Sequence, residues 1–579
     1  MGLFMERRLW SIAAFSFGSW LLCARAPISS ALFCLAAGVS GSLYARLLIK
    51  TFQAVDLKPL VWGAVSKLIV LKDLSRQEFF CIDGADKDLA KTREAALERM
   101  QSAWAKRWPK AQEKSKAVRK IWSDLRFKAS GFESTFPVFQ KVVNEIFDML
   151  TVVDRTEGTE VVDVDGCRFL DSCGSYGVNC FGHTKFKEFM DKGNDLAQQV
   201  GPCLGPMHPV VIDNIEMMLK VFRKEEASFH MSGTEAVMCA VQQVRFHTKR
   251  PLIAVFKGAY HGWWDGVMQG AGNPRFNSDC LVLKDKSPAS LELLKIRANE
   301  IAGVIVNPIS GMGWGKSTTA DLATHKVEGA GEEGINSFRK WLQQIRETCT
   351  ASGIPLIYDE TWAFQLGPGG AQDLYGVEAD IVTLGKALGG GHAVGAVVGP
   401  HKLMERRDPD RPMLVSFVVG TFKGSPMVMG SMNAVLNWVT TPEAAAEFNA
   451  HTERVSKWAE ACNATLSKED LPISVAAYRN MWCVCYSKPG VYNFLFHCYL
   501  RDAGLQMVWV GTSKMLLNLE FREKDFEKLT GILVSAAKQF KADGWWWEDG
   551  KKPSLPQLVL APTLEFHASR LKSWLGLGR

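Results

Sequence analysis

The sequence predicts an α/β protein in which helices cover a mainly parallel sheet. Helical patterns such as 337–351 separate five short β-rich runs, at 252–256, 301–306, 354–358, 380–384 and 394–398. This alternation is typical of a parallel sheet with helical connections. The 579 residues are 47% hydrophobic and 22% charged, which indicates a folded chain of several domains. The fourteen cysteines have no framework spacing, so we expect reduced thiols and no metal site.

The amino terminus contains two apolar runs, at 9–23 and 31–49, with Arg7, Arg8 and Lys50 on their outer flanks. Only the second run approaches the length of a membrane span. Basic residues on both outer flanks suit a hairpin whose ends face the cytoplasm. We therefore expect a membrane anchor that leaves the rest of the chain in the cytoplasm. The alternatives are a cleaved signal or organelle-targeting leader, which has a similar pattern, and a buried helix pair.

A basic helical extension follows the apolar runs. Between residues 86 and 128, apolar side chains such as Leu97 and Trp104 recur three or four residues apart, and Pro109 interrupts the series. This pattern predicts two amphipathic helices. We expect their basic face to be solvated, with contact to anionic lipid as the alternative. A net charge of +7 is too small to predict nucleic-acid binding.

An aspartate and a lysine follow two neighbouring strands of the predicted sheet. Asp359 closes one apolar run, and Lys386 comes just after the next. Successive parallel strands end at the same edge, where open α/β sheets bind ligands, so we expect both side chains in one site. Pyridoxal 5'-phosphate (PLP) chemistry needs this pair: the lysine forms an aldimine, and the carboxylate keeps the pyridine nitrogen protonated. An ordinary surface lysine is the alternative, but the apolar surroundings and the glycines at 389–391 favour a lysine of lowered pKa.

Two further segments are predicted at the same edge. Ser232, Gly233 and Thr234 form a tight turn between a strand and a helix. Free amides at a helix start, together with two hydroxyls, suit a phosphate monoester. Tyr260 and His261 leave the first of the five strands, and an aromatic ring there could stack on a pyridine. Each signal is weak alone, because Ser and Thr cap many helices and a Tyr-His pair is more often packing.

The order and spacing of these segments together resemble a known family. The motifs SGTEA, YHG, a strand-end DE, LGKALGGG followed by VGAVVG, and GTFKGSP occur in this order. The chain is thus similar to the class III (fold type I) PLP-dependent aminotransferases, especially the glutamate-1-semialdehyde aminomutase branch. The resemblance covers about 161–521 and implies the fold type I PLP-transferase architecture, with a large mainly parallel-sheet domain and a small α+β C-terminal domain.

With this resemblance the chain divides into six parts. They are a hydrophobic N-terminal segment at 1–50, the basic helical extension at 51–150, the N-terminal segment of the catalytic unit at 151–205, the large PLP-binding domain at 206–430, the small C-terminal domain at 431–545 and a tail at 546–579.

The resemblance also implies roles for the residues named above. Lys386 is expected to hold PLP and carry the proton of the 1,3-shift, and Asp359 to pair with the pyridinium. Tyr260, next to His261, is expected to stack on the ring. The phosphate would be held by Ser232, Gly233 and Thr234.

Other motifs imply a partner subunit and a substrate entrance. Thr421 matches a residue that, in the family, reaches the phosphate of the neighbouring subunit, which implies a homodimer with shared sites. Tyr176 and Asn179 lie in a segment similar to the one that lines the substrate entrance. Trp263 is a third substrate candidate, because its apolar pair with Trp264 would suit a long-chain or carrier-bound carbonyl compound.

Several residues depart from the family pattern around the expected substrate. They are Thr361, Asn307, His392, Lys423 and Ser425. The cofactor motifs are intact, so the departures leave the identity of the substrate undetermined but do not affect the predicted PLP chemistry. The resemblance implies amino-group transfer from an amino donor to a carbonyl acceptor, with pyridoxamine phosphate as the carrier. The alternatives are an intramolecular aminomutase and, in another class, a non-catalytic membrane-tethered scaffold.

Overall fold

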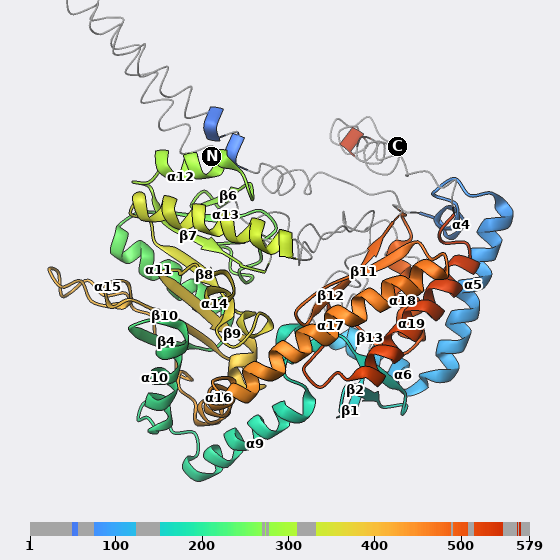
Figure 1. The fold of residues 1–579 in the computed structure, drawn as a ribbon, viewed down its shortest axis with the longest axis horizontal. Coiled ribbons are helices and arrows are strands. Elements are labelled where there is room, and N and C mark those ends of the chain that lie inside the picture. Colours follow the sequence, from blue (N-terminus) through green and yellow to red (C-terminus); the bar gives the residue numbers. More distant parts are fainter. Residues whose placement is uncertain are drawn as a thin grey trace, which may run out of the picture.

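The computed structural model describes residues 49–122, 151–309, 332–547 and 564–568, apart from gaps at 52, 56–73, 269–272, 274–276, 488–489, 508–514 and 565–566. A seven-stranded sheet forms the centre of the larger half (Figure 1). Its strands, in spatial order, are β4 (Glu226–His230), β10 (Gly395–Gly399), β9 (Ile381–Gly385), β8 (Leu356–Asp359), β7 (Ile301–Val306), β5 (Leu252–Phe256) and β6 (Cys280–Leu283). The α/β fold with a mainly parallel sheet is confirmed.

Helices cover both faces of this sheet. On one face lies α11 (Gly233–Thr248), whose apolar side chains share a core with residues of β5, β8 and β10. The helices of the other face are α10 (Val210–Phe222), α12 (Pro288–Ile296), α13 (Glu332–Ala351) and α16 (Pro426–Val439). Every central strand is buried on both sides. This burial explains why the strands appear in the sequence as continuous apolar runs.

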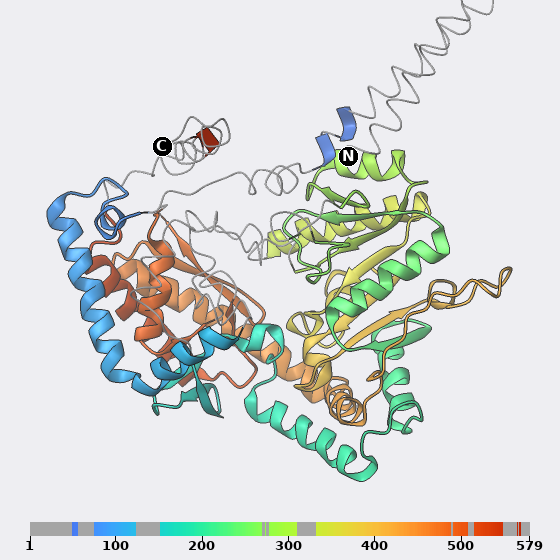
Figure 2. The same ribbon diagram turned by 180° about the vertical axis from the view of Figure 1, so that it is seen from behind.

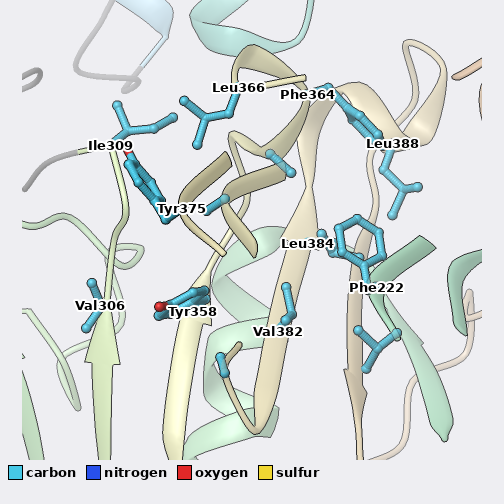
Figure 3. Close-up of a cluster of buried hydrophobic side chains, with 14 of the residues drawn as sticks. Phe222, Val306, Ile309, Tyr358, Phe364, Leu366, Tyr375, Val382, Leu384 and Leu388 are labelled. Carbon is cyan, nitrogen blue, oxygen red and sulfur yellow. The ribbon is translucent and has the colours of Figure 1, made fainter. Parts of the chain in front are cut away.

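The five predicted strands are all present, but one runs in an unexpected direction. The last of them, β10, is antiparallel to both β9 and β4. The connection from Gly385 to Gly395 is too short for the helical crossover that parallel neighbours need. The remaining pairs of the sheet are parallel. Beneath the strand ends, Tyr358, Val382 and Tyr375 belong to a continuous apolar core that holds this edge in place (Figure 3).

A smaller half lies beside the large sheet (Figures 1 and 2). It contains a three-stranded antiparallel sheet and a four-stranded sheet. The strands of the first are β11 (Ile473–Tyr478), β12 (Met481–Tyr486) and β14 (Met515–Leu516), and those of the second are β1 (Val153–Glu157), β2 (Glu160–Asp163), β3 (Arg168–Asp171) and β13 (Leu505–Gln506). The long helices are α17 (Pro442–Lys468) and α19 (Glu523–Ala542), with the shorter α18 (Phe496–Asp502) against α19.

The predicted basic helices belong to the outside of the smaller half. They are α5 (Lys87–Arg107) and α6 (Pro109–Ile121), divided at Pro109 as expected and preceded by α4 (Arg76–Phe80). Their apolar side chains, including Trp104 and Trp108, share one core with α18 and α19. The tryptophans that follow α19 also pack on this body, since Trp545 is buried and Trp546 donates to Asn493 Oδ1 at 3.0 Å.

The predicted membrane anchor lies outside the described residues, except for Ile49 at its end. Within the ranges that the structure does describe, no helix has both the length and the apolarity needed to cross a bilayer.

Candidate active site

The predicted aspartate and lysine meet at one edge of the large sheet. Asp359 ends β8, in register with Thr383 on the parallel neighbour β9. Lys386 follows β9 directly and begins a short 3₁₀ turn. The two side chains are close enough for the charge of Asp359 to act on the lysine. Asp359 and Lys386 therefore lie together at one edge of the sheet, as the sequence predicted.

Lys386 is held in an unusual backbone conformation. Its φ of 50° lies in the left-handed region, which residues with a side chain avoid unless the surroundings impose it. Burial lowers the pKa of Lys386, and the charge of Asp359 opposes this shift without cancelling it. The amine lies 5.1 Å from the centre of the Trp362 ring and makes no hydrogen bond within the described chain. A lowered pKa increases the fraction of neutral amine, which is the form that acts as a nucleophile.

Asp359 is almost fully buried and accepts hydrogen bonds on both oxygens. Oδ2 accepts from Nδ1 of His261 at 2.8 Å. Oδ1 accepts from the amide of Thr361 at 3.2 Å, from the Thr361 hydroxyl, and from the Thr383 hydroxyl at 3.5 Å. Burial alone would raise the pKa of Asp359, but the bonds from His261 and Thr361 and the charge of Lys386 outweigh it and lower the pKa. The carboxylate therefore stays ionised in a dry environment.

The predicted phosphate turn begins α11. Ser232 is the N-cap residue, and its hydroxyl accepts from the amide of Glu235 at 3.2 Å. The amides of Gly233 and Thr234 have no acceptor among the described residues. A helix start with free amides is an anion site. Its position is fixed by close packing, because a Cβ at Gly233 would lie 2.2 Å from the Thr361 methyl.

The Tyr-His-Gly motif lies against this turn. Gly262, with a φ of 93°, approaches Thr234 so closely that a Cβ there would lie 2.6 Å from its hydroxyl oxygen. His261 is buried and bonded to Asp359, while its Nε2 has no partner in the described structure. Tyr260 is 61% exposed. Its pKa is raised, mainly by partial burial and to a lesser extent by the charge of Asp359. The motif thus joins the carboxylate to the anion turn.

These groups fit the parts of PLP. Free amides and hydroxyls at the start of α11 match a phosphate, and a buried ionised carboxylate matches a pyridinium nitrogen. A buried amine of lowered pKa matches the aldehyde. All come from separate segments that the fold brings to one edge. A cofactor with these three features is what the arrangement can hold.

The three substrate candidates differ in their surroundings. Tyr176 is half-buried in a left-handed turn with a φ of 57°, and Asn179 is buried, with Oδ1 accepting from the amide of Gly182 at 3.0 Å. The Nδ2 of Asn179 has no partner in the part of the chain that is described. Trp263 is 75% exposed. The entrance turn is tied to the site through Gly177, whose backbone packs on the Trp362 ring.

Sequence reasoning missed Trp362 and Gln365. Trp362 lies between the entrance turn and the Lys386 amine, and Gln365 donates to the carbonyl of Gly177 at 2.9 Å. Asn480 of the smaller half donates in turn to Gln365 Oε1 at 2.6 Å. The available signal was their place directly after the strand-end Asp-Glu pair, where side chains turn toward the ligand edge.

Thr421 is exposed, and among the described residues its side chain makes no hydrogen bond to the phosphate turn of its own chain. Its neighbours in the sequence include three exposed apolar side chains, those of Phe417, Val419 and Phe422. The back view of the fold is shown in Figure 2. The role of Thr421 at the phosphate of a partner subunit stays a prediction.

Known proteins share this architecture and sequence pattern. A family model described as aminotransferase class-III matches residues 142–536. The chain is similar to glutamate-1-semialdehyde 2,1-aminomutase of Thermus thermophilus, with 30% identity over 413 residues, 66% of this chain and 91% of that protein. The enzyme of the same name from Hydrogenobaculum is 28% identical over 393 residues, 64% of this chain and 84% of that protein. A solved transaminase with PLP bound has 26% identity and a TM-score of 0.57, over 68% of this chain and 92% of its own.

Proposed function

We propose that this chain, which belongs to the class-III aminotransferase family, transfers an amino group from an amino donor to a carbonyl acceptor with PLP as its cofactor. The family consists of PLP-dependent enzymes. The observation that carries the proposal is the meeting, at one sheet edge, of the half-buried Lys386, the ionised Asp359 and the free amides of α11.

The chain's own residues supply binding, charge and proton transfer. When bound, PLP provides the electron sink that stabilises the substrate carbon after it loses a proton. The start of α11, with Ser232 and Thr234, would bind the phosphate and so orient the ring. Asp359 would keep the pyridine nitrogen protonated, because a buried carboxylate of lowered pKa stays negative beside it. Lys386 would hold the cofactor and, as a free amine, would carry the proton of the substrate carbon on Nζ.

The half-reaction tests this proposal. Purified protein with PLP should show the visible band of lysine-bound cofactor. An amino donor alone should bleach this band, and a carbonyl acceptor should restore it. Lys386→Ala should lack the band and lose roughly 10³-fold or more of the activity, because it removes both the attachment point and the proton carrier. Wild-type protein that binds no PLP, or a Lys386→Ala variant with normal turnover, would end the proposal.

An intramolecular aminomutase is the second candidate, and it is favoured by the name of both curated relatives above. In that reaction one molecule is donor and acceptor, so turnover needs no second substrate. Incubation with glutamate-1-semialdehyde alone separates the two functions. Isomerised product without an added acceptor supports the mutase, and dependence on an acceptor supports the transferase.

The active unit that we propose is a homodimer. Thr421 and the exposed Phe417 and Phe422 support it, because exposed apolar side chains close together in the chain are typical of an interface. Sedimentation of the purified protein should give twice the chain mass, and Phe417→Asp should shift it toward the monomer. A monomeric wild type with full activity would contradict this assignment.

We further propose membrane association through residues 1–50 and an apolar carbonyl substrate. The apolar runs of the sequence support the first, and the exposed Trp263 supports the second. Full-length protein should sediment with membranes, and a chain that starts at Thr51 should not. Preference for long acyl aldehydes over short keto acids, reduced in Trp263→Ala, would support the substrate class, and the reverse preference would refute it.

A further inference from the structure

We propose that the hydroxyl of Thr361 keeps a shared proton on the pyridine nitrogen of the cofactor rather than on Asp359, which makes Thr361 a positioning residue. This inference rests on the proposed PLP-dependent function. It concerns a residue whose side chain lies against both the carboxylate and the phosphate turn.

The carboxylate of Asp359 has one oxygen that is saturated and one that is not. Oδ1 accepts three hydrogen bonds, two from Thr361 and one from Thr383 at 3.5 Å. Oδ2 accepts a single bond, from Nδ1 of His261 at 2.8 Å. A carboxylate oxygen has about two acceptor positions. Oδ2 is therefore the oxygen with capacity for the N–H of a pyridinium ring.

The orientation of the Thr361 side chain is fixed by two glycines. A Cβ on Gly233 would lie 2.2 Å from the Thr361 methyl, and a Cβ on Gly385 would lie 2.8 Å from the same methyl. The methyl thus fills the space between the phosphate turn and the residue that precedes Lys386. A threonine side chain has few rotamers, so a wedged methyl also fixes the hydroxyl. The hydroxyl is directed at Oδ1 of Asp359.

A fixed donor at Oδ1 has a clear effect on the proton at Oδ2. A hydrogen bond to the ionised carboxylate stabilises that form and makes it a weaker base. The proton between Asp359 and the ring nitrogen is then held by the nitrogen, where it keeps the ring able to accept electrons. Valine has almost the same shape and would preserve the wedge, but it cannot donate.

The test reads the ring nitrogen directly. Holoenzyme prepared with ¹⁵N-labelled PLP reports protonation of the ring through the ¹⁵N chemical shift. Thr361→Val should move this signal toward the unprotonated value and lower kcat roughly 10-fold, as expected for loss of a bond to a charged group. Thr361→Ser, which keeps the hydroxyl, should stay near wild type. Thr383→Val removes the longer bond to the same oxygen, at 3.5 Å, and should therefore move the ¹⁵N signal less than Thr361→Val does.

The outcomes separate the possible failures. An unchanged ¹⁵N shift in Thr361→Val with bound cofactor would overturn the inference, and so would equal shifts in Thr361→Val and Thr361→Ser, since the variant that keeps the hydroxyl would then be as perturbed as the variant that lacks it. If Thr361→Val bound no cofactor, comparison of Thr361→Ser with Thr361→Ala would decide, and equal shifts in that pair would also overturn it. Wild-type protein that takes up no labelled PLP would instead defeat the proposed function.

Discussion

Charged side chains are buried in two parts of this molecule, and the two differ in how their bonds are completed. At the junction of the N-terminal helices with the smaller half, the guanidinium of Arg93 binds both oxygens of Asp83 at 2.9 and 2.8 Å. It also donates to the carbonyls of Phe80 and Gly544, at 2.8 and 2.9 Å. At the ligand edge of the large sheet, the amine of Lys386 has no such partner in the described chain.

A charge that supports the fold can thus be distinguished from one that serves a reaction, because the protein itself completes the hydrogen bonds of the first and not of the second. The guanidinium of Arg93 also lies over the Tyr492 ring, 4.7 Å from its centre, so all of its favourable contacts are made within the protein. Lys386 and the Nε2 of His261 are left with unused capacity next to an ionised Asp359. Buried polar groups without partners are costly, and folds retain them mainly where a ligand completes them. Variants of the two regions should therefore have opposite effects on stability and activity.

The largest effect is expected from Arg93→Ala. The substitution leaves the Asp83 carboxylate buried without its partner, which costs about 3–5 kcal/mol of the free energy of unfolding. Denaturant unfolding of the wild type and the variant measures this loss. Protein that remains folded should keep the cofactor band and wild-type activity, because Arg93 touches no residue of the site.

Arg76→Ala is the matched control for this prediction. Arg76 also bridges two acidic side chains, Glu94 and Glu98 at 2.9 Å each, but all three are exposed. Exposed pairs contribute about 0–1 kcal/mol. Equal losses in both variants would show that burial does not distinguish the two sites, and the comparison between the regions would fail.

Asp359→Asn should show the opposite pattern. Activity should fall roughly 10²- to 10³-fold, the usual consequence of removing one preorganised electrostatic group. The unfolding free energy of the cofactor-free protein should change by less than about 2 kcal/mol, since the weaker bonds to His261 and Thr361 are offset by loss of a buried charge. Steady-state kinetics and denaturant unfolding of the same preparation give both values. A variant that is strongly destabilised yet active would place Asp359 with the structural charges.

The sequence predicted the sheet because its strands are buried on both faces and therefore appear as apolar runs. It did not predict the direction of β10, although the short connection after Gly385 contained that information. The amphipathic pattern of α5 predicted an apolar face, but not what covers it. Trp104 and Trp108 pack near Arg501, nearly 400 residues away along the chain. A periodic pattern shows which face of a helix is buried, but it does not show which distant residues of the chain cover that face.

The sequence predicted the site residues that lie at the ends of strands. It did not predict the contacts made by side chains in the turn that follows a strand. Asp359, Lys386 and Ser232 were found because each lies at the end of a strand or within two residues of it. Trp362 was missed, since its contact with the Lys386 amine depends on the turn taken after β8. The bond from Thr361 to Asp359 has the same origin. Local geometry of this kind is set by packing against glycines from other segments.

The smallest expected effect concerns Glu360, a second buried acid beside the site. Burial raises its pKa to about 8, although the amide of Ala371 opposes the shift. In the unfolded chain this carboxyl ionises near 4.5, so between these two values the folded state holds a proton that the unfolded state has released. Stability contributed by Glu360 is therefore lost as the pH rises toward 8, with a slope of up to about 1.4 kcal/mol per pH unit.

Glu360→Gln isolates this contribution, because glutamine stays neutral at every pH. The difference in unfolding free energy between wild type and variant should decline from pH 6.5 to about 8 and then become constant. The buried His230 and His451, whose pKa values burial lowers to about 3, contribute equally in both proteins and therefore cancel in this difference. Parallel profiles for the two proteins would mean that Glu360 is ionised in the folded state. It would then belong with the unsatisfied charges of the site, since its Oε1 has no partner among the described residues.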